Sequence, residues 1–404
     1  MRAGRRYRLQ FTPEQAVFAD RIGGTCRSVW NTALEQRRSH QRRGAFISYR
    51  EQAAQLAEAK REPGLEWLVE APGHCLQQTL LDLDAACRVH GPWKVHWRGR
   101  SGSNRWTPSF RFPEGGKIRV ERLNRKTGRV RLPKLGWVRF RWSRPLGGSI
   151  RSATLKRDGR HWYVSFLVDT GRPEKAVSLQ RGRTGVDRGV ANAIATSDGN
   201  FFDRSFLSDG EQERLRRLER RRSKCRPGSR RRQATREKIR IIRRRERDRR
   251  RDFCVKAADL VVSGNALVVL EKLNIRGMTA SAKGTAEEPG TNVAAKTGQN
   301  RAILDKGWHL FELAVRNKSR VTGAVVRTIN PAYTSLTCPA EGCGNVDANN
   351  RKSQAEFACT CCGHAEHADT VGAKNTLARG HSGFRAWRPP AAGRVDEAPT
   401  SGKP

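Results

Sequence analysis

The N-terminal hundred residues change from a strand pattern to a helical pattern. Apolar and polar positions alternate over residues 5–11, which predicts a strand. Thr12 and Gln15 are placed to form a capping box, with Pro13 at the first helical position. Apolar residues then recur at the three- and four-residue spacing of amphipathic helices. We predict helices through the stretches with this spacing: residues 26–34, 49–62 and 74–89.

Residues 106–166 instead alternate with a period of two, and Pro and Gly interrupt them at intervals. This pattern is typical of strands joined by turns, and it predicts a β-barrel or a sandwich. Arg and Lys occupy many of the polar positions, so the outward face is expected to be basic. We expect the strand at residues 5–11 to join this sheet, which makes the helical stretch an insertion.

The second half alternates short apolar runs with longer helical patterns, as expected for an α/β domain. Strands are predicted within residues 184–196, 266–270 and 324–329, and an amphipathic helix over residues 300–320. Asp187 is expected to open one of these strands, and Glu271 lies at the carboxyl end of another. The arrangement predicts an RNase H-type core divided by insertions.

Three segments lie outside this pattern. Residues 214–251 are rich in Arg and are interrupted by Pro227-Gly228-Ser229, which predicts a basic helical hairpin. Residues 276–299 are rich in Gly, Ala, Thr and Lys and are expected to form a flexible loop. The residues after about 380 have the composition of a disordered tail.

The charge of the chain indicates a polyanionic partner. It has 80 Lys and Arg against 39 Asp and Glu among 404 residues, a formal net charge of +41. Such an excess is unfavourable through self-repulsion unless a polyanion neutralises it, and nucleic acid is the obvious candidate. No apolar run is long enough for a membrane span, and no apolar signal core follows the basic N-terminus. We therefore expect a cytoplasmic, nucleoid-associated protein without a membrane partner.

Half of the ten cysteines lie close together near the C-terminus. Two cysteine pairs about 15 residues apart have the spacing of a structural zinc ribbon in a reducing compartment. Cys361 could replace Cys362 only as part of an awkward C-x-C pair, and His364 or His367 could each substitute for one cysteine. The spacing favours this ligand set: Cys338, Cys343, Cys359 and Cys362.

Three acidic residues are candidates for a catalytic metal site: Asp187, Glu271 and Asp369. Taken singly, each is more often a turn residue, a salt-bridge partner or a helix cap. Glu271 ends an apolar strand, however, and open α/β sheets bind ligands at the carboxyl ends of their strands. Three converging carboxylates could hold two Mg²⁺ ions, with Mn²⁺ as an alternative, for phosphodiester cleavage.

Motifs in a fixed order extend over nearly the whole chain, about residues 5–380. They include Arg27-x-x-Trp30-Asn31, Gly185-Val186-Asp187-x-Gly189, Leu270-Glu271-x-Leu273-Asn274-Ile275, Asn330-Pro331-Ala332-Tyr333-Thr334-Ser335-x-x-Cys338 and Ala368-Asp369-x-x-Gly372-Ala373-x-Asn375. With these motifs in this order, the chain resembles TnpB, the OrfB-type protein of bacterial insertion sequences and a relative of type V CRISPR effector nucleases. Two features depart from the family pattern: the first cysteine pair is longer, and Lys272 follows Glu271 where the family often has an acidic residue.

The resemblance implies a transposon-associated, RNA-guided DNA endonuclease. Its partners would be a guide RNA from the end of the element and double-stranded target DNA. Asp187, Glu271 and Asp369 would bind Mg²⁺ in a RuvC-like core. The implied domains are a wedge-like β-barrel (residues 1–12 and 100–180), a helical recognition insert (13–99), the RuvC-like core (181–332 and 366–380), a zinc ribbon (333–365) and a disordered tail (381–404).

Two other functions remain open from the sequence. One is a nuclease-inactive, RNA-guided DNA-binding protein, against which the three retained carboxylates argue. The other is a transposase that acts in DNA recombination. Single-strand transposases use a His-hydrophobic-His pair, which this chain lacks. A small type V CRISPR effector is a related possibility, and a CRISPR array near the gene would distinguish it.

Overall fold

The computed structural model describes residues 1–99, 106–173, 175–176, 181–285 and 287–382. The chain divides into two compact units, Met1–Pro173 and Glu174–Pro404, and each is described separately. No helix in the described part of the chain is long and apolar enough to cross a membrane. The tail predicted at residues 381–404 lies, from residue 383 onward, outside the described residues.

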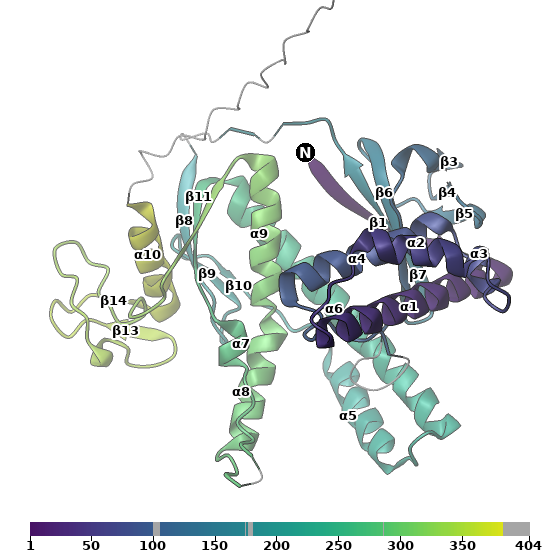
Figure 1. Ribbon diagram of the computed structural model, residues 1–404. Helices are drawn as coiled ribbons and strands as arrows, with labels where there is room; N and C mark the ends of the chain where they lie inside the picture. The colour runs from purple at the N-terminus through teal and green to yellow at the C-terminus, as the bar shows by residue number, and fades with distance from the viewer. Residues whose placement is uncertain (100–105, 174, 177–180, 286, 383–404) are drawn as a thin grey trace, which may run out of the picture. The chain divides into compact units, whose positions relative to one another are not determined.

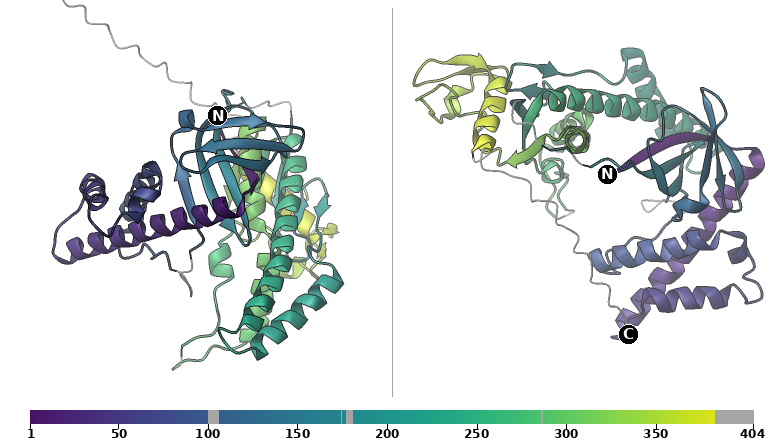
Figure 2. Two further views of the ribbon diagram at one scale, coloured as in Figure 1. Left: turned by 90° about the vertical axis from the view of Figure 1, so that its right-hand side faces the viewer. Right: turned by 90° about the horizontal axis from the view of Figure 1, so that it is seen from above.

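The first unit contains a seven-stranded antiparallel sheet in the order β2-β6-β7-β1-β5-β4-β3, which curls around its own core (Figure 2). As predicted, the N-terminal strand β1 (Arg2–Gln10) is part of it, pairing with β7 along most of its length and with β5 at its end. Tyr7 and Phe166 are fully buried inside this sheet. The other strands are β2 (Ser109–Phe112), β3 (Arg119–Arg122), β4 (Thr127–Leu132), β5 (Gly136–Arg141), β6 (Ser149–Asp158) and β7 (His161–Asp169).

Four helices are inserted between β1 and β2: α1 (Pro13–Arg42), α2 (Tyr49–Ala59), α3 (Trp67–Glu70) and α4 (Gly73–His90). The capping box at Thr12 and Gln15 is present, and Ser48 with Glu51 forms another at the start of α2. The sequence pattern missed the short α3. Leu34, Leu76, Leu80 and Leu83 form the apolar interface of α1 and α4.

A buried ion pair also joins these helices. Arg37 on α1 donates to Asp84 on α4 over 2.8 Å and to Gln52 on α2 over 2.8 Å. Both charged side chains are less than a tenth exposed. A buried charge without its partner is costly, so this network fixes how the three helices pack.

The second unit contains a five-stranded mixed sheet in the order β10-β9-β8-β11-β12 (Figure 1). The strands are β8 (Gly182–Asp187), β9 (Ile194–Thr196), β10 (Phe201–Phe202), β11 (Asn265–Glu271) and β12 (Val325–Ile329). β11 runs parallel to both β8 and β12, whereas β8, β9 and β10 are antiparallel. This mixed arrangement agrees with the RNase H-type core that the sequence predicts.

Helices cover both faces of this sheet, which explains why β11 is apolar at nearly every position. Val268 and Leu270 face the buried cluster with α6 (Arg230–Ser263) and α9 (Trp308–Thr322). The alternate residues Leu267 and Val269 face Leu377 on α10 (Ala368–His381). The side chains of one strand therefore hold two helical layers together.

Gly185 permits the close contact between α10 and β8. A Cβ atom at this position would lie 2.0 Å from the carbonyl oxygen of Ala373. We expect Gly185→Ala to lower the free energy of unfolding by about 2 kcal/mol or more, because the backbone of α10 must shift. Gly210 lies in helix α5 (Asp209–Lys224), and a Cβ atom there would meet nothing within 4 Å. Gly210→Ala should therefore leave the free energy of unfolding equal or higher, as urea denaturation would show. Equal stability of the two variants would contradict this packing.

Two sequence predictions in this unit are wrong in part. The loop predicted at residues 276–299 includes the start of a helix, because α8 runs over Val293–Lys306. Composition indicated a loop there, but the alanines of this segment are good helix formers. The single helix predicted at residues 300–320 is two helices, α8 and α9, since Gly307 has a left-handed φ of 74°. A short helix α7 (Ile275–Met278) follows β11.

The predicted basic hairpin is present. It consists of α5 (Asp209–Lys224) and α6, with a turn that contains Pro227 and Gly228. Leu215 and Leu218 on α5 pack against Ile239 and Ile242 on α6. Beyond the sheet, β13 (Glu356–Ala358) and β14 (Ala365–His367) form a small antiparallel hairpin directly before α10.

Candidate active site and metal centre

The fold brings the three predicted acidic residues to one edge of the mixed sheet. Asp187 is the last residue of β8 and Glu271 is the last residue of β11. The two strands are parallel neighbours with Val186 opposite Leu270, so the two carboxyl groups leave the sheet side by side. Asp369 comes from the first turn of α10. A Cβ atom at Gly372 would lie 3.3 Å from the Asp187 carboxyl carbon, so α10 passes directly over this group.

The side chains of Asp187 and Glu271 interact by a hydrogen bond, which raises the pKa of Asp187 and lowers that of Glu271. Burial is the main cause that raises the pKa of Asp187 to about 8, and the negative charges of Glu271 and Asp369 add to it. Burial also raises the pKa of Glu271, against the opposing effect of the Arg188 guanidinium. Without a metal ion the site therefore retains a proton, which a divalent cation would displace.

The spacing of the acidic group differs from that of the cysteines. In the part of the chain that the structure describes, the cysteine group has its ligand atoms all within 4.8 Å of one another, whereas the carboxylates are not grouped so closely.

Neighbouring side chains hold two of the carboxylates in place. Asn192 donates to Asp369 over 3.0 Å, and Thr334 donates to Glu271 over 3.4 Å. Arg188, whose side chain is fully buried, donates to the main-chain carbonyl of Glu271 and forms an ion pair of 3.1 Å with Glu312. Sequence reasoning assigned no role to these residues, although Thr334 belongs to one of the motifs that carry the resemblance.

The raised pKa of Asp187 predicts how stability depends on pH. Between its ordinary pKa of 3.8 and about 8, the folded protein keeps a proton that the unfolded chain has released. Folding stability from this group is therefore present at acidic pH and decreases as pH rises through this window. Over this pH range, we expect the free energy of unfolding of the metal-free protein to fall by at least about 1 kcal/mol more than that of the Asp187→Asn variant. Thermal unfolding at several pH values measures this.

Added Mg²⁺ provides the control for the pH experiment. At alkaline pH the cation should raise the melting temperature of the unchanged protein, since it binds the ionised carboxylates of the folded state only. The Asp187→Asn variant should respond much less. If the melting temperatures of the two proteins change with pH in the same way, Asp187 is not the group that holds the proton.

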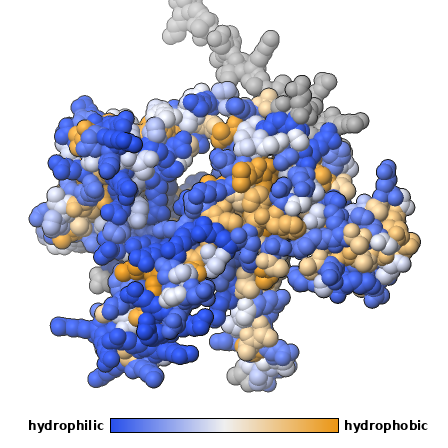
Figure 3. Space-filling view, turned by 180° about the vertical axis from the view of Figure 1, so that it is seen from behind, coloured by the Kyte–Doolittle hydropathy of each residue, from blue (hydrophilic) through white to orange (hydrophobic). Residues whose placement is uncertain are grey.

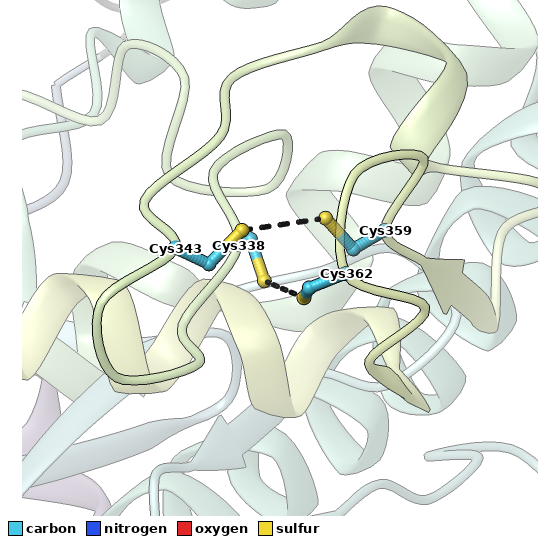
Figure 4. A group of neighbouring side chains, drawn as sticks. All are labelled: Cys338, Cys343, Cys359 and Cys362. Atoms are coloured by element: carbon cyan, nitrogen blue, oxygen red, sulfur yellow. Dashed lines mark hydrogen bonds between the residues drawn. The ribbon is translucent and has the colours of Figure 1, made fainter.

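The four predicted cysteines form a compact cluster (Figure 4). Cys338 and Cys343 lie in the loop before the small hairpin, and Cys359 and Cys362 lie in the turn between its two strands. The Sγ atoms of Cys338 and Cys362 are 3.6 Å apart, and those of Cys343 and Cys359 are 3.7 Å apart. A tetrahedral zinc ion with Zn–S bonds of about 2.3 Å requires sulfur atoms about 3.8 Å apart. The cluster therefore fits a zinc ion, and four protein ligands leave no position open for substrate.

The alternative ligands that the sequence left open have other contacts. Cys361 is exposed and is not part of the cluster. Its backbone N–H donates to the Cys359 sulfur. The backbone N–H of Cys362, and to a smaller extent that of Cys361, lower the pKa of Cys359 to about 6, which favours the thiolate. His364 contacts Glu366 at 3.2 Å, and the Nδ1 atom of His367 accepts from the backbone N–H of Asp369.

The segment that carries the four cysteines, residues 333–367, is connected directly to the acidic site; we call it the cysteine segment. Asn375 on α10 donates to the carbonyl oxygens of Thr334 and Thr337, over 2.8 and 2.7 Å. Arg351 extends from this segment to Asp369, with 3.7 Å between the charged groups. The fold of the cysteine segment therefore helps to position two of the three carboxylates.

The end of the basic hairpin is a cationic surface without carboxylates. Near the sheet the hairpin is internally neutralised, for example by Glu211 with Arg245 and Arg249. No acidic residue occurs between Glu219 and Glu237, which bracket the turn. Cationic side chains line a recess of about 540 Å³ there, and the surface is almost wholly hydrophilic (Figure 3). The main cationic residues of this recess are Arg217, Arg220, Arg221, Lys224, Arg226 and Arg231.

Three known sequence families match parts of the chain. A family described as "Probable transposase" (OrfB_IS605) matches residues 165–282, and a helix-turn-helix family of the same OrfB type matches residues 1–45. In this structure the latter residues form mainly β1 and the single long helix α1. A family described as "Cas12f1-like, TNB domain" matches residues 308–376, which include the cysteine cluster.

Full-length relatives are also found. The chain is 34% identical over 384 residues to the "Putative RNA-guided DNA endonuclease InsQ" of Escherichia coli (strain K12), covering 93% of this chain and 92% of that protein. It is 29% identical over 386 residues to a "Putative RNA-guided DNA endonuclease" of Streptomyces pristinaespiralis, covering 93% and 88%. The fold resembles Cas12f1 in the solved Cas12f1-sgRNA-target DNA complex, with a TM-score of 0.57 at 13% identity and coverage of 91% and 83%.

The mixed α/β fold is therefore similar to that of Cas12f1. The identity to full-length relatives decides the family. The chain belongs to the TnpB family of OrfB-type insertion-sequence proteins, which is related to the type V CRISPR effectors.

Proposed function

We propose that the protein is a transposon-associated, RNA-guided DNA endonuclease with a two-metal RuvC mechanism. The observation that carries this proposal is the convergence of Asp187, Glu271 and Asp369 at one edge of the mixed sheet. All three carboxylates are retained, and two of them keep side-chain donors that orient them. Membership of a family whose named relatives are RNA-guided DNA endonucleases supports the same function.

In this proposal the three carboxylates would hold two Mg²⁺ ions, or Mn²⁺ in their place. Bound there, the ions would supply an activated water and a stabilised leaving oxygen for phosphodiester hydrolysis. Asn192 and Thr334 would keep Asp369 and Glu271 in their binding orientation. A zinc ion on the four cysteines would have a structural role, stiffening the segment that carries Arg351.

The partners are a guide RNA and double-stranded target DNA. The formal net charge of +41 and the carboxylate-free end of the α5–α6 hairpin provide sites for their phosphates. The proposed roles of the domains follow the sequence prediction. The curled sheet would be the wedge, the four inserted helices would form the recognition insert, and the cysteine segment would be the zinc ribbon within the RuvC-like core.

The first test is to purify the protein from cells that carry its native flanking DNA and to sequence the RNA that co-purifies. A discrete RNA from the end of the element is expected, and the complex should then cut matched DNA in the presence of Mg²⁺. Heterogeneous cellular RNA would argue instead for a protein that binds DNA without a guide. A discrete RNA without cleavage would favour the nuclease-inactive alternative, and excision of donor DNA would favour a transposase.

Arg351 provides a further prediction, because its guanidinium is the cation nearest to Asp369 from the cysteine segment. Its positive charge offsets carboxylate repulsion and lies where the substrate phosphate would approach. We expect Arg351→Ala to reduce the cleavage rate about tenfold or more, with RNA content unchanged. The exposed neighbour Lys352→Ala is the control and should cut normally. If both variants lose activity equally, the effect comes from the general charge of this segment.

A further inference from the structure

Arginine guanidinium groups lie over tryptophan rings in the first unit. The guanidinium carbon of Arg38 lies 5.2 Å from the ring centre of Trp93 and 4.7 Å from that of Trp97. Arg42 lies 4.9 Å from the ring of Trp93. Such cation–π contacts fix the orientation of the rings and surround them with positive charge. The same pattern continues at Arg98, 3.8 Å from the ring of Trp30 and 4.9 Å from that of Trp106.

Hydrogen bonds hold the segment of residues 91–98 against α1, so this arrangement is formed in advance of any ligand. Arg38 donates to the carbonyl oxygens of Pro92 and Val95, over 3.2 and 2.9 Å. Asn31 exchanges two hydrogen bonds with the main chain of Arg98, over 3.3 and 2.9 Å. A ring that is held in place loses little entropy when a ligand stacks on it.

The outer part of this arrangement is unusually exposed for apolar side chains. Trp93 is 49% exposed and Phe46, just beyond the end of α1, is 78% exposed. Phe46 and Pro92 line a cavity of about 260 Å³, together with Arg37 and Arg88. This volume is below the roughly 300 Å³ at which sites for drug-sized molecules begin, so it suits a single flat ring. We call Phe46, Trp93, Arg42 and Arg88 the aromatic–arginine surface.

The charge of this surface fits an anionic ligand. No acidic residue occurs in residues 36–50 or 85–98, the two segments that form it. Asp84 lies beneath and is already bound by Arg37 and Arg88, each over 2.8 Å. Glu35 is paired with Arg42 at 3.7 Å. The exposed Arg43 and Lys94 add further positive charge.

We propose that the aromatic–arginine surface binds unpaired bases of a single-stranded nucleic acid. Stacking of bases on aromatic rings between arginines is the usual way in which proteins bind single strands without reading their sequence. A duplex hides its base faces and would contact only the arginines. A second copy of this chain would bring another large positive charge, which opposes association through this surface. The site is separate from the three carboxylates, so the inference requires a nucleic-acid partner but not cleavage.

Photo-crosslinking tests this proposal at the level of single residues. The full chain, freed of co-purified nucleic acid in high salt, is irradiated without Mg²⁺ with oligonucleotides of about twelve nucleotides that carry 5-iodouracil. Peptide mapping should place adducts on Phe46 or Trp93. Phe46→Leu with Trp93→Leu should lower the yield there about tenfold, since leucine keeps apolar volume but cannot stack. Trp93→Phe is the matched control and should keep most of the yield, and adducts elsewhere in the chain report correct folding.

Competition distinguishes the ligand sources. An unlabelled single strand should remove the adducts, whereas a duplex of equal length or vesicles of anionic phospholipid should not. Separate RNA and DNA oligonucleotides show which single strand binds better. Adducts only at other residues, or equal competition by duplex or vesicles, would overturn the proposal. Because no Mg²⁺ is present, failure here is independent of failure of the proposed nuclease function.

Discussion

Replacing Asp187 by alanine is expected to reduce target cleavage by at least about a thousandfold while the bound RNA remains. Removal of a carboxylate that holds catalytic metal ions forfeits several kcal/mol of transition-state stabilisation, and each 1.4 kcal/mol is about a tenfold change in rate. The side chain lies at the end of β8 beneath α10. Cleavage of matched DNA by the purified RNA complex measures the effect.

The matched control for this experiment is Asp252→Ala. Asp252 lies on α6 and forms an exposed ion pair of 2.8 Å with Lys256, so its loss should change neither stability nor cleavage appreciably. The Asp187 variant should also be at least as stable as the unchanged protein in alkaline, metal-free buffer, because a buried and repelled carboxyl group has been removed. Persistent cutting by a well-folded Asp187→Ala protein would end the assignment of this site.

The sequence singled out these three acidic residues because each carboxylate is at the end of an element with a strong local pattern. Glu271 follows an unbroken apolar run, as expected for a strand that is covered on both faces. Asp369 precedes Gly372 and Ala373, whose small size allows α10 to approach β8. The convergence itself depends on the parallel pairing of β8 with β11, residues about eighty positions apart, and no local pattern contains that information.

The residues that orient the carboxylates were not predictable in the same way. Asn192, Thr334 and Arg351 are polar residues in turns or short loops, where such residues are ordinary. Their roles arise from distances across the fold rather than from spacing along the chain. Arg351 in particular reaches Asp369 only because the cysteine segment folds back towards α10.

Helix boundaries were the weaker part of the sequence prediction. The break between α8 and α9 depends on one left-handed residue, Gly307, within a continuous amphipathic pattern. A Cβ atom there would meet the side chains of Arg250 and Cys254 at 3.0–3.2 Å, so the glycine also permits the approach of α6. A glycine inside a helical pattern has more than one interpretation, and tertiary contacts decide between them.

Loss of the cysteine cluster is the second change with a large expected effect. We expect the purified protein to contain about one zinc ion per chain, and Cys359→Ser to lose it, since a structural zinc site requires all four ligands. Structural zinc sites of this kind contribute about 10–16 kcal/mol of binding free energy in isolated peptides, which becomes folding energy of the segment. Residues 333–367 should then lose their order and become sensitive to protease.

The cleavage rate should fall when the zinc is lost, because the cysteine segment helps to position the carboxylates of the active site. Thr334 donates to Glu271 and Arg351 contacts Asp369, so disorder of the segment removes both contacts while the three carboxylates remain in the chain. Metal analysis, limited proteolysis and the cleavage rate should therefore change together in Cys359→Ser. Cys361→Ser is the matched control: its thiol is exposed and outside the cluster, so zinc content, protease resistance and cleavage should all be retained. Loss of zinc from the Cys361 variant, with zinc retained in the Cys359 variant, would reverse the ligand assignment.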